Sequence, residues 1–224
     1  MRSQVSSLLA GLLGDIVALD AHIILLNVCG FVFLSFPFAV GIAGSIRVGQ
    51  LLGGNLPLEA RRATGVILVL TCAGCIGTAA AFLGARDVIG AAFTKDAEVV
   101  SAISKLVPIA ALFQVSDGVQ SAVAGVLRGM GRQQLVACLN FVGFWVIGTA
   151  VGATLTFGPP RLGVAGLWWG LAIGITATSI VGAARLTATD WAAEAAKAKR
   201  RIAGDNERQF QTDQGNFPGS FVGP

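Results

Sequence analysis

Long apolar stretches separated by short polar connections dominate this chain. Six uninterrupted runs follow one another: about Val5–Leu19, Ala21–Ile46, Ala63–Gly84, Leu106–Leu127, Leu135–Phe157 and Val164–Arg185. About 20 apolar residues in a helix cross the hydrocarbon core of a bilayer. Continuous runs of this length favour helices, because a membrane strand alternates apolar and polar residues over about ten positions. The pattern therefore predicts an all-α polytopic membrane protein.

The first run is shorter than the others. Its roughly 15 residues reach only about 22 Å at 1.5 Å per residue, which is less than the ~30 Å hydrocarbon core. We expect it to be a membrane span that lacks its beginning. This gives about six transmembrane helices in residues 1–186, the first of them truncated, followed by a tail over residues 187–224.

Composition excludes a water-soluble domain. The 224 residues are 54% hydrophobic and only 12% charged, whereas about a quarter of the residues of a soluble domain carry charge. The sequence contains no pattern typical of a catalytic nucleophile with its base, a phosphate-binding loop or a metal cluster. We therefore predict a protein that is not an enzyme and needs no cofactor or metal.

Basic residues fall in alternate connections between the runs. They are Arg47, Arg61 and Arg62 after the second run, Arg128 and Arg132 after the fourth, and Lys197, Lys199, Arg200 and Arg201 after the sixth. Short loops rich in Lys and Arg stay on the cytoplasmic side. We therefore predict six crossings with both ends cytoplasmic, and we interpret the net charge of +4 as an orientation signal rather than a nucleic-acid interface.

The tail divides into two parts. Trp191–Ile202 has the composition of a basic helix that lies along the cytoplasmic membrane surface, with Trp191 at the level of the lipid headgroups. From Gly204 to Pro224 the chain is polar, and we expect it to be disordered.

Polar residues inside the apolar runs are the candidate functional groups. Asp117 lies near the middle of the fourth run, with Gln114 and Gln120 close by. A carboxylate at that depth costs about 2.5–3.5 kcal/mol on insertion scales, so it should face protein or a water-filled cavity. Two interpretations stay open, a cation-carrying group in transport and a neutral structural aspartate.

Other polar residues in these runs are weaker candidates. Asn27 and Asn140 are amides of the kind that commonly bridge membrane helices. His22 begins the second run, and we expect it at the outer membrane boundary.

Small residues and prolines indicate how the helices pack. Glycines recur at four-residue intervals at Gly125 and Gly129, at Gly148 and Gly152, and at Gly166, Gly170 and Gly174. Such stripes allow the backbones of neighbouring helices to approach closely. We further expect Pro37 to kink the second run and Pro108 to open the fourth.

Three segments resemble the multidrug and toxic compound extrusion (MATE) transporters, most of all their eukaryotic branch. Residues 44–55 (GSIRVGQLLGGN), with EARRA at 59–63, are similar to the loop after the family's eighth helix. DGVQ at 117–120 and GVLRGMGRQ at 125–133 resemble the tenth helix and its exit loop, and GVAGLWWG at 163–170 resembles the start of the twelfth. The three motifs occur in the family's order and span about Gln4 to Arg201.

The resemblance implies that this chain is the C-terminal lobe, helices seven to twelve, of a two-lobe transporter. Members of the family exchange organic, often cationic, compounds and xenobiotics for H⁺ or Na⁺ by rocking two lobes about a central cavity. The implied partners are membrane lipid, small organic substrates and the N-terminal six-helix lobe of the same transporter, in a plasma or vacuolar membrane. A non-transporting truncated subunit that packs against another lobe is the alternative.

The resemblance also assigns roles to residues. Asp117 matches the acidic position of the tenth helix that serves cation coupling and substrate binding, and Gln114 and Gln120 flank it. Gln4 stands where eukaryotic members usually carry a glutamate, and Asn27 falls near another acidic position, so Asp117 becomes the principal candidate. Five further residues belong to the loop motifs: Arg47, Gly49, Gly53, Arg128 and Gly129.

Overall fold

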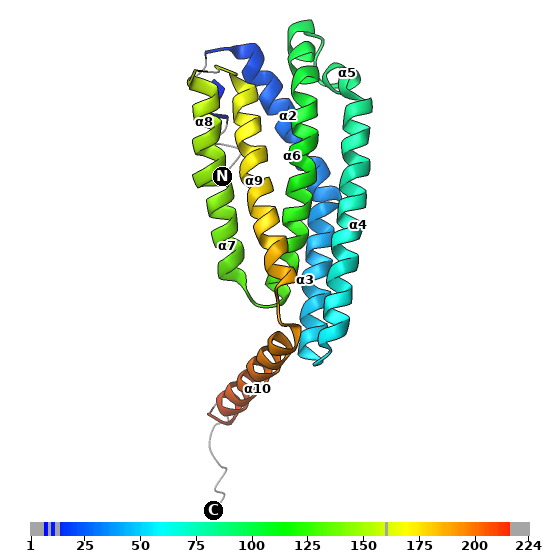
Figure 1. Ribbon diagram of the computed structural model, residues 1–224, viewed down its shortest axis with the longest axis vertical. Helices are drawn as coiled ribbons and strands as arrows, with labels where there is room; N and C mark the ends of the chain where they lie inside the picture. Colours follow the sequence, from blue (N-terminus) through cyan, green and yellow to red (C-terminus); the bar gives the residue numbers. More distant parts are fainter. Residues whose placement is uncertain (1–6, 9, 12–13, 160, 216–224) are drawn as a thin grey trace, which may run out of the picture.

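The computed structural model describes residues 7–8, 10–11, 14–159 and 161–215, and these form a bundle of long helices (Figure 1). In chain order the helices are α2 (Ile16–Ser35), α3 (Pro37–Gly53), α4 (Pro57–Gly84), α5 (Arg86–Ile89), η1 (Gly90–Ala92), α6 (Ala97–Gly129), α7 (Gln133–Phe141), η2 (Val142–Thr149), α8 (Ala150–Phe157), α9 (Val164–Thr187) and α10 (Trp191–Gly215). Five stretches of the described residues are long and apolar enough to cross a membrane: Ile16–Gly53, Pro57–Gly84, Ala97–Gly129, Gln133–Phe157 and Val164–Thr187. The predicted all-α membrane architecture is confirmed, and the first predicted span, Val5–Leu19, lies partly outside the described residues.

The first connection differs from the predicted one. Helix α2 begins at Ile16 and contains Asp20, which the run boundaries had placed between two helices. The turn lies earlier, where Gly14 adopts a positive φ of 68° and the Asp15 carboxylate accepts a hydrogen bond from the Ala18 amide at 3.0 Å. A glycine in the left-handed region ends a helix, whereas one aspartate within an apolar run does not.

The two prolines behave differently from each other. As predicted, the helix is interrupted at Pro37, which has no amide hydrogen to donate: α2 ends at Ser35, Phe36 is non-helical, and α3 begins at Pro37. Pro108 stands at the start of the fourth apolar run but lies inside α6, which begins at Ala97 and is capped there by Asp96. The helix is longer than the apolar run because it begins with polar turns before Leu106.

Helix α6 lies at the centre of the bundle (Figure 1). In its most apolar 18-residue stretch, half of the residues are buried inside the protein, compared with 17% in the corresponding stretch of α4. One apolar cluster surrounds its first half and includes Leu25, Ile103, Val107, Trp168 and Ile175. A second surrounds its last turns and includes Val48, Leu52, Val126, Leu127 and Leu186. Between the clusters, α6 buries a polar belt consisting of Gln114, Ser116, Asp117, Gln120 and Ser121.

The glycine stripes lie where helices touch backbone to backbone. A methyl group on Gly125 would collide with the carbonyl of Gly41 in α3, and one on Gly174 would collide with the carbonyl of Gly143 in η2. At Gly166 the added methyl would lie 2.7 Å from the backbone nitrogen of Thr156. The predicted close approach of the helices is therefore confirmed.

His22 packs inside the bundle. Its side chain is fully buried, and its ring meets Trp168 edge-on, with 5.7 Å between the ring centroids. Helix α2 begins at Ile16, which places His22 nearly two turns inside the helix, and its position at the outer membrane boundary stays a prediction.

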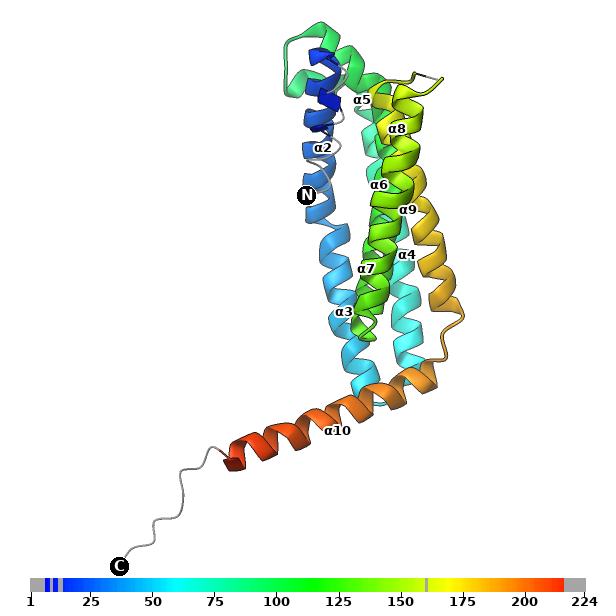
Figure 2. The ribbon, with the colours of Figure 1, turned by 90° about the vertical axis from the view of Figure 1, so that its left-hand side faces the viewer.

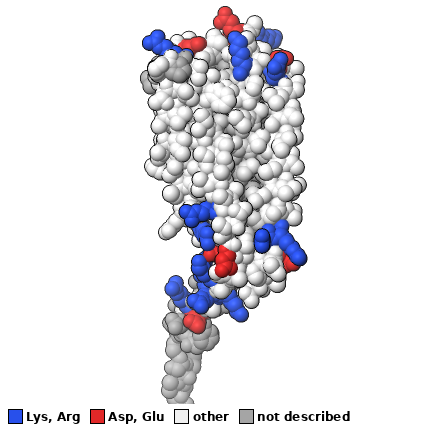
Figure 3. All heavy atoms as spheres, in the orientation of Figure 1, with Lys and Arg blue, Asp and Glu red and all other residues white. Residues whose placement is uncertain are grey.

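Charged residues gather at the two ends of the bundle and leave a broad uncharged band between them (Figure 3). We call one end the basic end: it carries the α3–α4 and α6–α7 connections and α10. The opposite end carries α5, η1 and the α8–α9 connection. This distribution matches the two groups of connections recognised in the sequence.

Helix α10 crosses the basic end instead of continuing the bundle (Figure 2). The Glu194 carboxylate, 3% exposed, accepts hydrogen bonds from Arg132 at 2.7 Å and Lys197 at 2.9 Å. Arg201 donates to the Met130 carbonyl at 3.1 Å. The helix extends to Gly215, so the disorder expected from Gly204 is wrong up to that residue. The last residues, 216–224, lie outside the described part of the chain.

Replacement of Gly125 by alanine should destabilise the bundle. The new methyl group meets the Gly41 carbonyl, and overpacking of this kind costs about 1–3 kcal/mol. Thermal or detergent unfolding of the purified chain measures the loss. Gly77→Ala is the matched control, because nothing lies within 4 Å of a methyl group there. Equal stability of the two variants would contradict the close approach.

The attachment of α10 should depend on pH. Burial alone would raise the pKa of Glu194, but hydrogen bonds from Arg132 and Lys197 outweigh burial and hold that pKa below its usual value. A carboxyl with a lowered folded-state pKa adds stability above its ordinary pKa of about 4.3, and this stability is lost as pH falls through the lower folded value.

Amide hydrogen exchange over Trp191–Ile202, corrected for intrinsic rates, measures this attachment. We expect protection to hold above about pH 5 and to fall in more acidic solution. Glu194→Gln should lower protection at neutral pH and flatten the profile. Glu59→Gln, which removes only an exposed ion pair with Arg62, serves as the control. A Glu194→Gln profile identical to that of the original chain would refute the role of the ion pairs.

Candidate functional site

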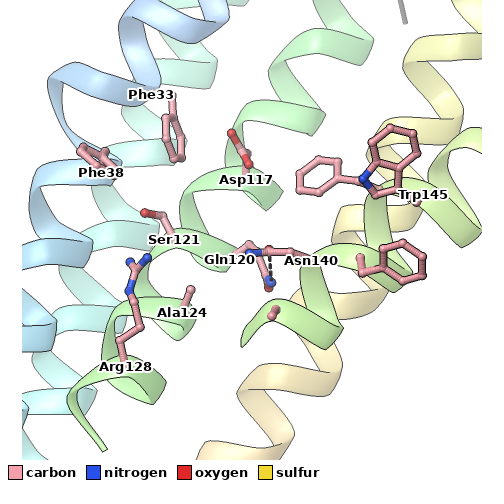
Figure 4. Close-up of a pocket in the computed structure, with 12 residues that line it drawn as sticks. Phe33, Phe38, Asp117, Gln120, Ser121, Ala124, Arg128, Asn140 and Trp145 are labelled. Carbon is pink, nitrogen blue, oxygen red and sulfur yellow. Dashed lines mark hydrogen bonds between the residues drawn. The ribbon is translucent and has the colours of Figure 1, made fainter. Parts of the chain in front are cut away.

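One face of α6 forms the wall of a cavity at mid-depth in the bundle. Asp117, Ser121, Ala124 and Arg128 all line it, and their spacings of four, seven and eleven residues bring them to one side of a 3.6-residue helix. The cavity measures about 460 Å³, and Figure 4 shows Asp117, Ser121 and Arg128 along this face. We call it the polar cavity.

A second cavity meets the other side of the same carboxylate. It measures about 470 Å³, and its lining is apolar apart from Asn27, Asp117 and Cys29. We call it the apolar cavity. Phe33, Asp117 and Phe144 line both cavities, so one buried carboxylate and two aromatic rings are shared by the two volumes.

Aromatic rings from four helices and η2 line the two cavities that Asp117 adjoins. The rings that line one or both cavities are Phe31, Phe33, Phe38, Phe113, Phe141, Phe144 and Trp145. Phe33 and Phe38 contact each other across the α2–α3 break, with 5.9 Å between their ring centroids. Aromatic faces attract organic cations, more strongly when water is excluded. A carboxylate that shares its cavities with such rings has the chemistry of an organic-cation site.

Hydrogen bonds hold the polar belt in place. Gln120 donates through Nε2 to Asn140 on α7 at 3.3 Å, which agrees with the predicted role of Asn140 between helices. Ser121 donates to the Pro37 carbonyl at 3.1 Å, within the α3–α6 contact. The Oε1 atom of Gln120 is buried and has no hydrogen-bond partner among the described residues. The residue itself is one of those that line the polar cavity.

The predicted site residues divide into those the fold brings together and those it does not. Asp117 and Gln120 share the polar cavity, and Asn27 lines the apolar cavity while it donates to the Ile23 carbonyl at 2.9 Å. Gln114 is fully buried and lines neither cavity. Gln4 lies outside the described residues.

Most residues of the loop motifs contribute to helix contacts. A methyl group on Gly129 would lie 2.6 Å from the Ser45 carbonyl, and Gly49 faces Gly129 from the opposite helix. Gly53 faces Ile202 of α10. Arg47 is exposed and lines neither cavity. Arg128 differs from these four residues because it lines the polar cavity.

The aromatic lining was not predicted from the sequence. Phe33 and Phe38 are five residues apart, and only the break at Pro37 lets both reach the same cavity. Phe144 and Trp145 belong to η2, a stretch of π-helix within the α7–α8 span. A π segment widens the helical turn and re-aims its side chains, and no residue pattern announced it here.

Comparisons with known proteins agree with this geometry. The MatE family model matches residues 1–154. Multidrug and toxin extrusion protein 1 of Mus musculus is 31% identical over 188 residues, 84% of this chain and 33% of the mouse protein. Multidrug resistance protein PmpM of Pseudomonas aeruginosa is 34% identical over 215 residues, 94% of this chain and 42% of the bacterial protein.

A plant relative is similar in both sequence and structure. Protein DETOXIFICATION 14 of Arabidopsis thaliana is 32% identical over 178 residues, 80% of this chain and 36% of the plant protein. The crystal structure of the eukaryotic MATE transporter AtDTX14 superposes with a TM-score of 0.84 at 29% identity, over 90% of this chain and 45% of that one.

These matches extend over most of this chain but over less than half of each relative. The chain therefore spans about a third to two fifths of the length of the curated relatives compared here. The motif order, the helical bundle and the match to the family over residues 1–154 agree, and the chain belongs to the MatE family of multidrug and toxic compound extrusion transporters.

Proposed function

We propose that this chain is the C-terminal lobe of an antiporter that exports organic, often cationic, compounds in exchange for H⁺ or Na⁺. The observation that carries the proposal is the position of Asp117, which is 4% exposed, lies in the middle of a membrane-spanning helix and forms a wall of two cavities. An intramembrane ionisable residue beside a cavity is typical of a transport pathway.

The exchange depends on competition for one carboxylate. A proton or Na⁺ on Asp117 neutralises it, and an organic cation that enters the aromatic lining replaces that ion because both need the same negative charge. Each ligand therefore lowers the affinity of the carboxylate for the other. Export follows when the two ligands are released on opposite sides of the membrane.

Alternating access requires a second six-helix lobe. Relatives more than twice the length of this chain support a partner lobe in the same transporter. The backbone contacts of α6 with α3, and of α9 with η2, favour movement of this lobe as one body. We propose that it rocks against the N-terminal lobe, with substrate held between them.

The charge distribution supports an orientation. Unpaired and paired Lys and Arg residues are concentrated at the basic end, and loops rich in these residues stay cytoplasmic. We propose that the basic end faces the cytoplasm and that α10 lies there along the lipid headgroups of a plasma or vacuolar membrane.

Substitution of Asp117 by asparagine should remove cation binding while preserving the fold. The amide keeps the shape but not the charge, so affinity for ethidium, a fluorescent organic cation, should fall about tenfold or more, equivalent to ~1.4 kcal/mol or more. Fluorescence anisotropy of the chain in lipid nanodiscs measures it. Binding to the original chain should also release protons into weakly buffered solution or weaken as Na⁺ is added.

Asp87→Asn is the matched control, because Asp87 lies at the opposite end in α5 and accepts from Ser104. Its ethidium affinity should equal that of the original chain. An Asp117→Asn variant that binds ethidium unchanged would remove this carboxylate from the proposed mechanism.

A further inference from the structure

The polar cavity has a positive charge as well as a negative one. Asp117 and Arg128 are the two charged residues in its lining among the described residues, and the apolar cavity has Asp117 alone. Both charges project from the same face of α6, so the carboxylate and the guanidinium lie at two heights along one wall.

Arg128 is available to a ligand, unlike several of its basic neighbours. Arg132 pairs with Glu194, Arg62 pairs with Glu59, and Arg201 donates to a backbone carbonyl. No described residue forms an ion pair or a hydrogen bond with Arg128. A guanidinium with free donors is well suited to bind a carboxylate or another planar anion in a bidentate manner.

Arg128 is exposed and lines the polar cavity, and its side chain runs along the cavity wall. Side chains on a helix lean toward its N-terminus, and Asp117 lies on the N-terminal side of Arg128. Figure 4 shows the guanidinium extended along α6 toward Ser121, away from the end of the bundle.

The spacing of the two charges sets the size of the ligand. Eleven residues of helix correspond to about 16 Å along the axis, and the lean of Arg128 toward Asp117 shortens the distance between the charged groups. The wall between them is formed by Ser121 and Ala124, with the unpartnered Oε1 of Gln120 beside it. A ligand that reaches both charges must be elongated.

We propose that Arg128 is a specificity-determining residue that binds an anionic group of the substrate, so that the polar cavity selects elongated organic zwitterions with a cationic and a carboxylate end. This inference rests on the proposed function for the cationic end, which Asp117 binds. Arg128 binds the anionic end, and Ser121 and Ala124 line the wall that the ligand follows between the two charges.

Matched pairs of compounds test the inference directly. Each pair consists of a trimethylammonio-alkanoate and its methyl ester, which share the cation and the chain and differ in the anionic end. Calorimetric titration of the chain in uncharged lipid nanodiscs gives the two dissociation constants, for short and for long alkyl chains. We expect the long-chain acid to bind about tenfold more tightly than its ester, a difference of ~1.4 kcal/mol, and the short-chain acid to show no such gain.

Variants assign the gain to one residue. Arg128→Gln should remove the preference for the long-chain acid. Arg128→Lys should keep part of it, because lysine retains the positive charge but lacks the planar guanidinium that donates two parallel hydrogen bonds to a carboxylate. Arg61→Gln is the matched control, since Arg61 is exposed at the same end of the bundle and lines neither cavity. It should keep the full preference.

Three results would overturn the inference: a long-chain acid that binds no better than its ester, a preference that survives Arg128→Gln, or an equal loss in Arg61→Gln. The last would indicate general attraction of anions to the basic end. Asp117→Asn separates this inference from the proposed function, because it should weaken acid and ester alike. Unchanged ester affinity in Asp117→Asn, with loss of the acid preference in Arg128→Gln, would refute the cation site and leave the anion site standing.

Discussion

Direct backbone contact between α6 and its neighbours is the constraint on which the rest of this structure depends. Lipid supplies no hydrophobic force between helices, so association relies on close packing. Gly125 faces the Gly41 carbonyl, and Ser121 donates to the Pro37 carbonyl one turn away. These contacts bring α3 against α6 and leave α6 with neighbours on most sides, so that residues in its middle turns are protein-facing.

That central position makes the polar belt tolerable. A buried carboxylate in contact with lipid would cost several kcal/mol, but Asp117 faces two cavities inside the bundle instead. Apolar clusters on either side along α6 separate the belt from both ends of the bundle. The same arrangement leaves room beside the carboxylate, and aromatic rings from α2, α3, α6, α7 and η2 line that room. The central position of α6 therefore accounts both for the packing of the lobe and for the open space beside the Asp117 carboxylate.

The sequence predicts a site residue only where a polar side chain stands out within the apolar run of a single helix. Asp117 and Gln120 were recognisable because polar residues are rare within apolar runs. Gln114 carries the same signal but is fully buried and lines neither cavity, which its sequence position does not show. Arg128 was grouped with the loop motifs, since sequence alone does not show whether an arginine at a helix end turns toward solvent or toward a cavity.

Hydrophobic length and the placement of charge determined this protein's class from sequence alone. Because the bilayer requires each span to be long, helical and apolar, the helical architecture and its five described spans follow from the amino acids with no knowledge of their contacts. Only the tertiary structure decided that His22 is enclosed by the bundle, that α2 and α3 divide at Pro37 to bring two phenylalanines together, and that one carboxylate adjoins two cavities. These features depend on which faces of separate helices meet, and that choice is made by packing between residues far apart in the chain, such as Gly41 and Gly125.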